Sequence, residues 1–274
     1  MSTLYVIKIG GNVIDHPESL DRFLGDFSDL EGHKILIHGG GKIATKLASD
    51  LGIHSQMVEG RRVTDAESLK VVSMVYAGLI NKNIVASLQH KNCNAIGLSG
   101  ADGNMIHAKR RPIKEVYSAE KAATVQVDYG FVGDLDNDSV NFESIHKLLE
   151  AGFSPVFSAI THDGKGQLLN TNADTIASAI AVAMSKLYDT SLVFCFEKAG
   201  VLRDVNDDSS VIRLIEPASY AELKRQGIIN DGMIPKLDNA FDAINQGLKE
   251  VCIGKADALP LLKEDNFGTR LISK

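Results

Sequence analysis

The sequence of 274 residues lacks tryptophan, has three cysteines and shows no excess of basic residues. Its net charge of −6 argues against nonspecific nucleic-acid binding, which needs a basic surface. Cys93, Cys195 and Cys252 are far apart and form no CxxC pair, so we expect neither a disulfide framework nor a zinc site. Reduced, buried thiols are more typical of a cytoplasmic protein.

We also expect neither a leader sequence nor a membrane-spanning segment. The first strand is expected to begin near Leu4, which leaves no room for a signal peptide. No run is expected to be long enough to span a bilayer. We therefore expect a cytoplasmic protein with no membrane partner.

The chain instead alternates between strand-like and helix-like segments. Short β-rich runs such as "LYVIKIGGN" and "HKILIHGGG" end in glycine. A long helical segment is expected over residues 64–91, and Thr64 and Glu67 have the spacing of a capping box at its start. From Met105 to Leu135 the pattern becomes that of hairpin strands, which we expect to be separated by the charged segment "KEVYSAEK", residues 114–121. The alternation predicts an α/β fold with a mostly parallel central sheet and a β-hairpin insertion. We expect a soft boundary near residue 170, which separates an N-terminal lobe (1–170) from a C-terminal lobe (171–274).

The stretch "KILIHGGGKIA", residues 34–44, is a strand that ends in three glycines, a common way to build a phosphate site. It lacks the GK[ST] ending of a Walker loop. Gly39, Gly41 and Ala44 satisfy the GxGxx[GA] spacing of a dinucleotide site, and Glu59 lies where an acidic residue for the ribose is expected. A nicotinamide-dependent oxidoreductase therefore remains one alternative.

Other polar side chains favour a different phosphate chemistry. Lys8 is flanked by apolar residues in a strand, where an ammonium group is costly unless it is paired or meets an anion. Lys236 follows Pro235 near an expected helix start, where the helix dipole disfavours a cation but a bound anion would relieve the conflict. Asn172 is a plausible N-cap, and Asp174 would then lie in the first helical turn. Surface lysines and simple capping would explain each feature singly, but together they suit phosphoryl transfer.

A set of motifs extends this interpretation over nearly the whole chain: "KIGGN", "HGGG", "EGRRVT", "LSGADG", "NTNAD", "INDGMIPK" and "GTRL". In this order they closely resemble the N-acetylglutamate kinases, a branch of the amino-acid kinase family. The resemblance implies a three-layer α/β/α sandwich. It also implies ATP-dependent phosphorylation of the γ-carboxylate of N-acetyl-L-glutamate in arginine biosynthesis, with Mg²⁺ held mainly through the nucleotide phosphates and by no protein ligand.

Residue roles follow from the same resemblance. Lys8 would meet the transferring phosphoryl group, Lys236 would stabilise charge on the leaving phosphate, and Asp174 would hold both lysines. Arg62 would bind the α-carboxylate of the acylated amino acid, and Asn170 the same end of that substrate. Two loops would present backbone amides to the phosphates and the substrate carboxylate, and they are formed by Gly10, Gly11, Gly39, Gly40 and Gly41.

Some features depart from the family pattern or leave alternatives open. In "CFEKAGV", residues 195–201, Phe196 and Glu197 replace a small polar residue and an aspartate, so the adenine and ribose contacts stay unassigned. Arg61 and the basic residues 109–111 leave N-succinyl-L-glutamate open as the substrate, because its acyl group carries an extra carboxylate. A non-catalytic amino-acid sensor is a further alternative, which the intact lysines oppose.

The resemblance also concerns assembly and regulation. It implies a homodimer formed by the N-terminal lobe, through the long helix after Thr64. Arginine-inhibited members of the family carry an additional helix before the first strand, and only Met1, Ser2 and Thr3 precede that strand here. We therefore expect a homodimer that arginine does not inhibit.

Overall fold

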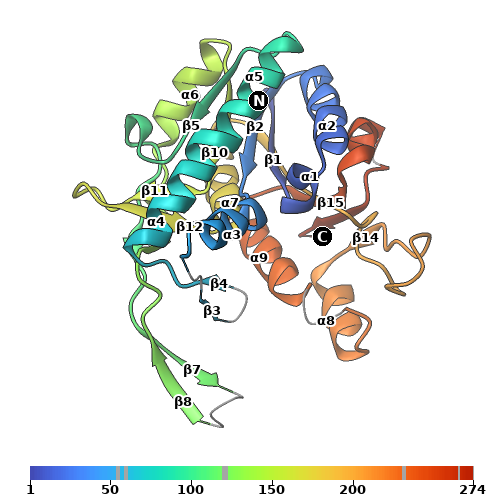
Figure 1. Cartoon of the computed structure of the whole chain (residues 1–274). Helices are drawn as coiled ribbons and strands as arrows, with labels where there is room; N and C mark the ends of the chain where they lie inside the picture. Colours follow the sequence, from blue (N-terminus) through green and yellow to red (C-terminus); the bar gives the residue numbers. More distant parts are fainter. Residues whose placement is uncertain (54–55, 59–60, 119–122, 230–232, 265, 274) are drawn as a thin grey trace.

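An eight-stranded sheet forms the centre of the molecule (Figure 1). The computed structural model describes residues 1–53, 56–58, 61–118, 123–229, 233–264 and 266–273. In spatial order the strands are β14 (Leu214–Ile215), β16 (Thr269–Ile272), β15 (Glu250–Lys255), β13 (Asp189–Phe196), β1 (Thr3–Ile9), β2 (His33–His38), β10 (Ser154–Ser158) and β5 (Ala95–Leu98). Neighbours are parallel except β15 and β16, which confirms the predicted mostly parallel sheet.

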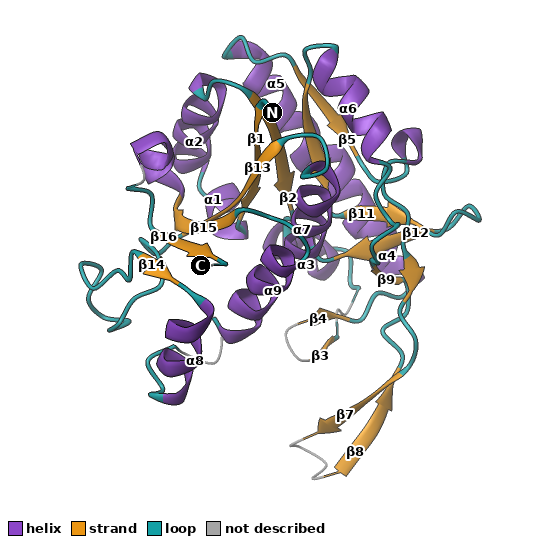
Figure 2. Ribbon diagram, turned by 180° about the vertical axis from the view of Figure 1, so that it is seen from behind, coloured by secondary structure: helices purple, strands orange, loops and turns teal. Residues whose placement is uncertain are grey.

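Helices cover both faces of this sheet, as the three-layer prediction required. The helices are α1 (Gly11–Asp15), α2 (Pro17–Asp29), α3 (Gly41–Asp50), α4 (Ala66–Ser73), η1 (Met74–Ile80), α5 (Asn81–His90), η2 (Asp102–Asn104), α6 (Phe142–Glu150), α7 (Ala173–Met184), α8 (Pro217–Arg225), α9 (Ile234–Asn245) and η3 (Ala256–Glu264). On one face lie α6, α7 and α9, and on the other lie α2, α5 and η3 (Figures 1 and 2).

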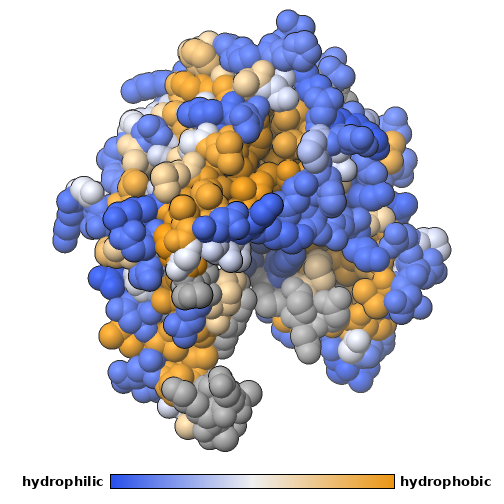
Figure 3. All heavy atoms as spheres, viewed as in Figure 1, coloured by the Kyte–Doolittle hydropathy of each residue, from blue (hydrophilic) through white to orange (hydrophobic). Residues whose placement is uncertain are grey.

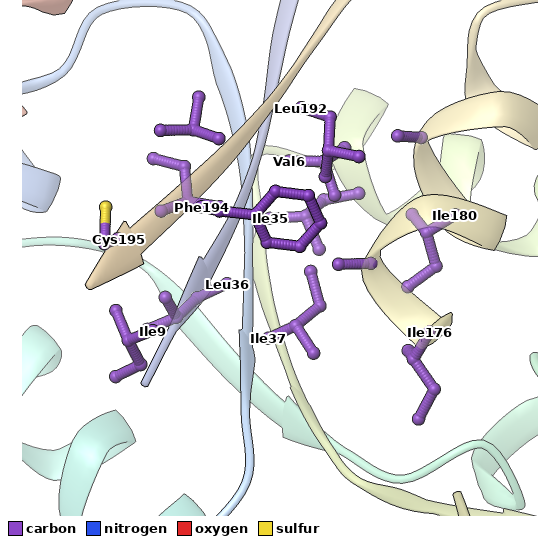
Figure 4. Close-up of a cluster of buried hydrophobic side chains, with 14 of the residues drawn as sticks. Val6, Ile9, Ile35, Leu36, Ile37, Ile176, Ile180, Leu192, Phe194 and Cys195 are labelled. Atoms are coloured by element: carbon purple, nitrogen blue, oxygen red, sulfur yellow. The ribbon is translucent and has the colours of Figure 1, made fainter. Parts of the chain in front are cut away.

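The central strands are apolar on both faces because both faces are covered by helices. Figure 4 shows this packing. The side chains that point toward Ile176 and Ile180 of α7 are Val6, Ile35, Ile37, Leu192 and Phe194. Those that point away from α7 are Ile9, Leu36 and Cys195. Side chains alternate along a strand, so Lys8 lies on the same face as Val6, beside α7. Lys8 pairs in register with Phe194 of the neighbouring strand β13.

The predicted hairpin region contributes strands to two further β-structures. One is a four-stranded sheet, in which β9 (Val132–Asp134) and β6 (Lys109–Arg110) of this region join β11 (Ile160–His162) and β12 (Leu168–Thr171) from outside it. The other is a hairpin of β7 (Lys114–Ser118) and β8 (Ala123–Val127), which projects from the body (Figure 1). The charged segment "KEVYSAEK" was expected to connect strands, but most of it is itself β7. In this strand Val116 is buried, whereas the charged Lys114 and Glu115 before it are exposed.

The long helix is continuous from α4 through η1 to α5, and η1 is a π-helical turn. Its N-cap is Asp65, whose side chain accepts a hydrogen bond from Ser68 N at 2.7 Å, so the expected capping box from Thr64 to Glu67 was wrong. By length and composition residues 66–90 could cross a bilayer, contrary to our expectation. In this structure the helix packs against β5 and β10, and 44% of its apolar window is buried.

Candidate active site

Both glycine-rich segments lie at the same edge of the sheet, because β1 and β2 are adjacent and parallel. Gly10 and Gly11 follow β1, and the amide of Gly10 donates a hydrogen bond to Cys195 O of β13 at 3.1 Å. Ligands of open α/β sheets bind at this carboxyl edge.

The second segment, Gly39 to Gly41, leads from β2 into α3, and its middle position requires glycine. Gly40 has a φ of +148°, which residues with side chains rarely adopt. A Cβ atom here would also overlap Cδ1 of Ile80, so the long helix packs directly against this loop.

Lys8 and Asp174 form an ion pair across this edge. The Nζ of Lys8 lies 2.7 Å from Oδ1 of Asp174, and the lysine side chain is 11% exposed. Asp174 is held in the first turn of α7 by the N-cap Asn172, whose Oδ1 accepts hydrogen bonds from the amides of Asp174 and Thr175 at 2.8 and 3.1 Å. The cost of burying Lys8 in an apolar strand is therefore offset by a carboxylate that a helix start holds in place.

Lys236 approaches the same cluster from the first turn of α9. The preceding residues Asp231 and Gly232, predicted to form a turn, lie outside the described residues. The Nζ of Lys236 lies 3.8 Å from the centroid of the Phe196 ring, and Nζ of Lys8 lies 5.2 Å from that centroid. Burial and then the charge of Lys8 lower the pKa of Lys236, while Asp174 acts in the opposite direction.

A cavity of about 300 Å³ adjoins the strand ends. Its lining includes Lys8, Gly11, Gly39, Gly40, Gly41, Arg62 and Asn170. Gly10, Asp174 and Lys236 do not line it, but they adjoin it through Gly11, Lys8 and the Phe196 ring. All the predicted site residues are thus brought together at one edge of the sheet.

Arg62 and Asn170 are fixed at the cavity wall by hydrogen bonds. Arg62 is 8% exposed, and its Nη2 donates to Gly41 O at 3.2 Å and to Thr45 Oγ1 at 2.7 Å. The Nδ2 of Asn170 donates to Thr64 Oγ1 at 3.1 Å. The side chain of Arg61, the alternative to Arg62, is outside the described part of the chain, as is Glu59.

Two further lining residues were not assigned to the site from sequence. Tyr76 reaches the cavity from the π-helical turn, and nothing in its sequence neighbourhood indicates this. Arg111 was noted only as part of a basic run. It is 7% exposed, its Nε donates to Asp134 Oδ1 at 3.0 Å, and its guanidinium lies 5.1 Å from the centroid of the Tyr129 ring.

Directly before the glycine loop lies a fully buried histidine that sequence reasoning also missed. The Nδ1 of His38 is 2.9 Å from Gly39 O, and its Nε2 is 3.0 Å from Asn81 Nδ2. Burial lowers the pKa of His38 to about 4, so the ring is neutral near pH 7. The histidine therefore acts as an uncharged support beneath the loop.

A second cavity, of about 600 Å³, lies in the C-terminal half. It is lined by Lys198, Gly200, Val201, Leu202, Arg203, Asp204, Val205, Gly227, Ile228, Ile229 and Met233. Residues 198–201 belong to the stretch that departs from the family pattern, and Met233 is the N-cap of α9, three residues before Lys236. Figure 3 shows the molecule hollowed between the part that carries β3 (Met57–Val58) and β4 (Arg61–Arg62) and the part that carries α8.

Comparison with known proteins is consistent with this geometry. The sequence profile of the amino acid kinase family matches residues 3–255. The chain is 53% identical to an acetylglutamate kinase of Cytophaga hutchinsonii, over 100% of both chains, and 52% identical to one of Bacteroides thetaiotaomicron, over 98% of both. N-acetylglutamate synthase from Neisseria gonorrhoeae, solved with coenzyme A and N-acetyl-glutamate, has the same fold, with a TM-score of 0.76, 20% identity and coverage of 100% of this chain and 60% of that one. These matches favour a kinase over the oxidoreductase and sensor alternatives.

Proposed function

The chain belongs to the amino acid kinase family, and we propose on that premise that it transfers the γ-phosphoryl group of ATP to the γ-carboxylate of N-acetyl-L-glutamate, a reaction of arginine biosynthesis. The observation that carries the proposal is the meeting of two ammonium groups and one carboxylate beside two glycine-rich strand ends. Such a site neutralises and positions anions, which is what phosphoryl transfer requires.

The acceptor needs no general base in this reaction. A glutamate side chain, with a pKa of roughly 4.3, is already ionised at neutral pH. The obstacle is repulsion between this carboxylate and the triphosphate. Lys8 would neutralise the phosphoryl group in transit, Lys236 the leaving phosphate, and Asp174 would keep Lys8 in place.

Mg²⁺ would reduce the same repulsion when it is bound with the nucleotide. In the described part of the chain no group of three or more His, Cys, Asp or Glu side chains is placed to hold a metal ion. This suits an ion held mainly by phosphate oxygens and water, as Mg²⁺ commonly is.

The two cavities suggest how the substrates are divided between the lobes. The smaller cavity, with Arg62, Asn170 and the glycine amides, would take the acylglutamate, and the guanidinium of Arg62 suits a bidentate contact with its α-carboxylate. The larger cavity, which ends near α9, would take the nucleotide. Residues 1–170 would then be the acylglutamate lobe and 171–274 the nucleotide lobe, with transfer across the border at Lys8.

The acyl group is assigned as acetyl for a physical reason. Arg111 lines the acylglutamate cavity, where it is positioned to meet the extra carboxylate of a succinyl group. However, its guanidinium is already paired with Asp134, with Nη2 2.5 Å from Oδ1, so a second carboxylate would compete with an existing partner. Hence acetyl, which brings no further charge, fits this lining better.

One assay tests both the reaction and the acyl group. The protein is incubated with ATP, Mg²⁺, hydroxylamine and either acetyl- or succinylglutamate, so that any acyl phosphate is trapped as a hydroxamate. We expect hydroxamate formation with a higher kcat/KM for acetylglutamate. No hydroxamate from either substrate would refute the kinase, and a large preference for succinylglutamate would refute the acetyl assignment.

We propose that the long helix forms the contact of a homodimer. Figure 3 shows hydrophobic side chains gathered along it, and Met74 and Leu79 are 56% and 52% exposed. Light scattering should give twice the chain mass of 29.5 kDa. Replacing both residues by glutamate should yield the monomer mass, because the charges would be buried in the contact. A double variant that keeps the dimer mass would place the contact elsewhere.

A further inference from the structure

Phe196 lies between the two lysines of the site. It is the last residue of β13, and the alternation of that strand puts it on the same face as Phe194, which pairs in register with Lys8. Its ring centroid is 3.8 Å from Nζ of Lys236 and 5.2 Å from Nζ of Lys8. The ring stacks on Phe194, with 6.0 Å between centroids and 16° between planes, so its orientation is fixed by the core.

The charges of this cluster are unequally paired. Asp174 lies 2.7 Å from Lys8. Among the residues that the structure describes, no carboxylate oxygen lies within 4 Å of Nζ of Lys236, so the aromatic face is the close attractive partner of this second ammonium. The pKa of Lys236 is lowered, first by burial and further by the charge of Lys8, and the more distant Asp174 and Glu197 oppose this.

We infer that Phe196 is a positioning residue for Lys236, and that its ring holds the ammonium group at the phosphate side of the site through a cation–π contact. The inference rests on the proposed kinase reaction. A carboxylate in this place would hold the lysine but would also neutralise it. A ring attracts the cation through its quadrupole and carries no net charge, so Lys236 keeps its full attraction for a phosphate oxygen. The aromatic residue that departs from the family pattern thereby has a role.

If the Phe196 ring had a purely structural role, kcat would depend on the shape of the ring and not on the electron density of its face. Changing the electron density alone therefore tests the inference directly. Phe196 is replaced by phenylalanine with one, two and three fluorine atoms, which progressively withdraw electron density from the ring face with little change in shape. We expect kcat to fall stepwise, by about tenfold in total, since a desolvated cation–π contact contributes a factor of this order. The KM for acetylglutamate should change little.

The matched control is the same fluorinated series at Phe157. This side chain is fully buried in β10, and no cation–π contact to it is found among the described residues. The kcat of the protein should stay constant through the Phe157 series. An unchanged kcat at position 196, or an equal fall at positions 157 and 196, would overturn the inference.

A second measurement needs no turnover. In protein with ¹³C-labelled lysine, the ε-methylene signal of Lys236, assigned with Lys236→Arg, should be shifted upfield by the ring current. In Phe196→Leu this shift should vanish and the pKa of Lys236 should fall further, because the ring no longer favours the charged form. An unshifted wild-type signal would overturn the inference. Failure of the wild type to form hydroxamate, with the shift and its loss observed, would overturn the proposed function alone.

Discussion

Acidification should destabilise this protein through His38. Since Nδ1 faces the carbonyl of Gly39, it carries the proton, and Nε2 accepts a hydrogen bond from Asn81 Nδ2. The same Nδ2 donates to Val156 O at 2.9 Å, so the Asn81 amide is held in this orientation. A second proton on the ring would therefore point at an N–H group in a fully buried site.

The magnitude follows from the pKa of His38, which burial lowers from 6.5 to about 4. The unfolded chain takes up the proton first as the pH falls, so stability is lost from about pH 6.5 downward and the loss is complete below about pH 4. A difference of about 2.5 pH units, at about 1.36 kcal/mol per unit, corresponds to about 3 kcal/mol. This is a large share of the roughly 5–15 kcal/mol typical of a folded protein.

Urea unfolding at pH 7 and pH 4.5 measures this loss. We compare the wild type with His38→Gln, which offers Asn81 an acceptor but does not titrate, and with His90→Gln, a control at an exposed position of the long helix. Between the two pH values the wild type and the His90 variant should lose about 2.5 kcal/mol more than the His38 variant. Parallel losses in all three proteins would mean that His38 is not a buried neutral histidine, and the reasoning would fail.

Three further predictions concern the site. Lys8→Met and Lys236→Met should fold but lower kcat by about 10²–10³ with smaller effects on KM, because each removes one charge contact from the transition state; near-normal turnover of either would contradict its role. Arg62→Lys should raise KM for acetylglutamate strongly and KM for ATP little, since one ammonium does not reproduce the planar fork, and equal effects on both constants would make Arg62 structural. Gly40→Ala should lower the free energy of unfolding by about 1–3 kcal/mol, through its positive φ and the overlap with Ile80, whereas Gly25→Ala, where a Cβ meets nothing within 4 Å, should not.

The sequence predicted those parts of the site whose chemistry conflicts with their local setting. A lysine inside an apolar strand and a lysine at a helix start both indicated an anion, and the structure brings Lys8 and Lys236 to one aromatic ring. The mostly parallel sheet followed from strands that are apolar on both faces. These signals are local, so they can be recognised without knowing what lies across the fold.

Other features depend on contacts between distant segments, and no local pattern indicates them. Tyr76 reaches the cavity only because the long helix crosses the glycine loop, and the bond from Asn81 to His38 joins residues in separate elements. Phe196 was recognised as unusual, but its contact with Lys236 depends on where α9 begins. Strand β7 was missed because it begins with two exposed charged residues, Lys114 and Glu115, and Val116 alone is buried among its described side chains.

The π-helical turn limits which insertions and deletions this chain can tolerate. In it the amide of Asn81 donates to Tyr76 O, five residues back, where an α-helix would pair residues four apart. The turn therefore holds one residue more than an α-helical turn, so deleting one residue from 74–80 would let this segment become α-helical while α4 and α5 keep their relative orientation. Asn81 would then still point at His38 and Val156, whereas a second deletion would turn the following helix by about 100° and the buried imidazole beneath the glycine loop would lose its donor. The length of this one helical turn thus sets which side chain supports the phosphate site, so the gap pattern of related chains is as informative here as their residue identities.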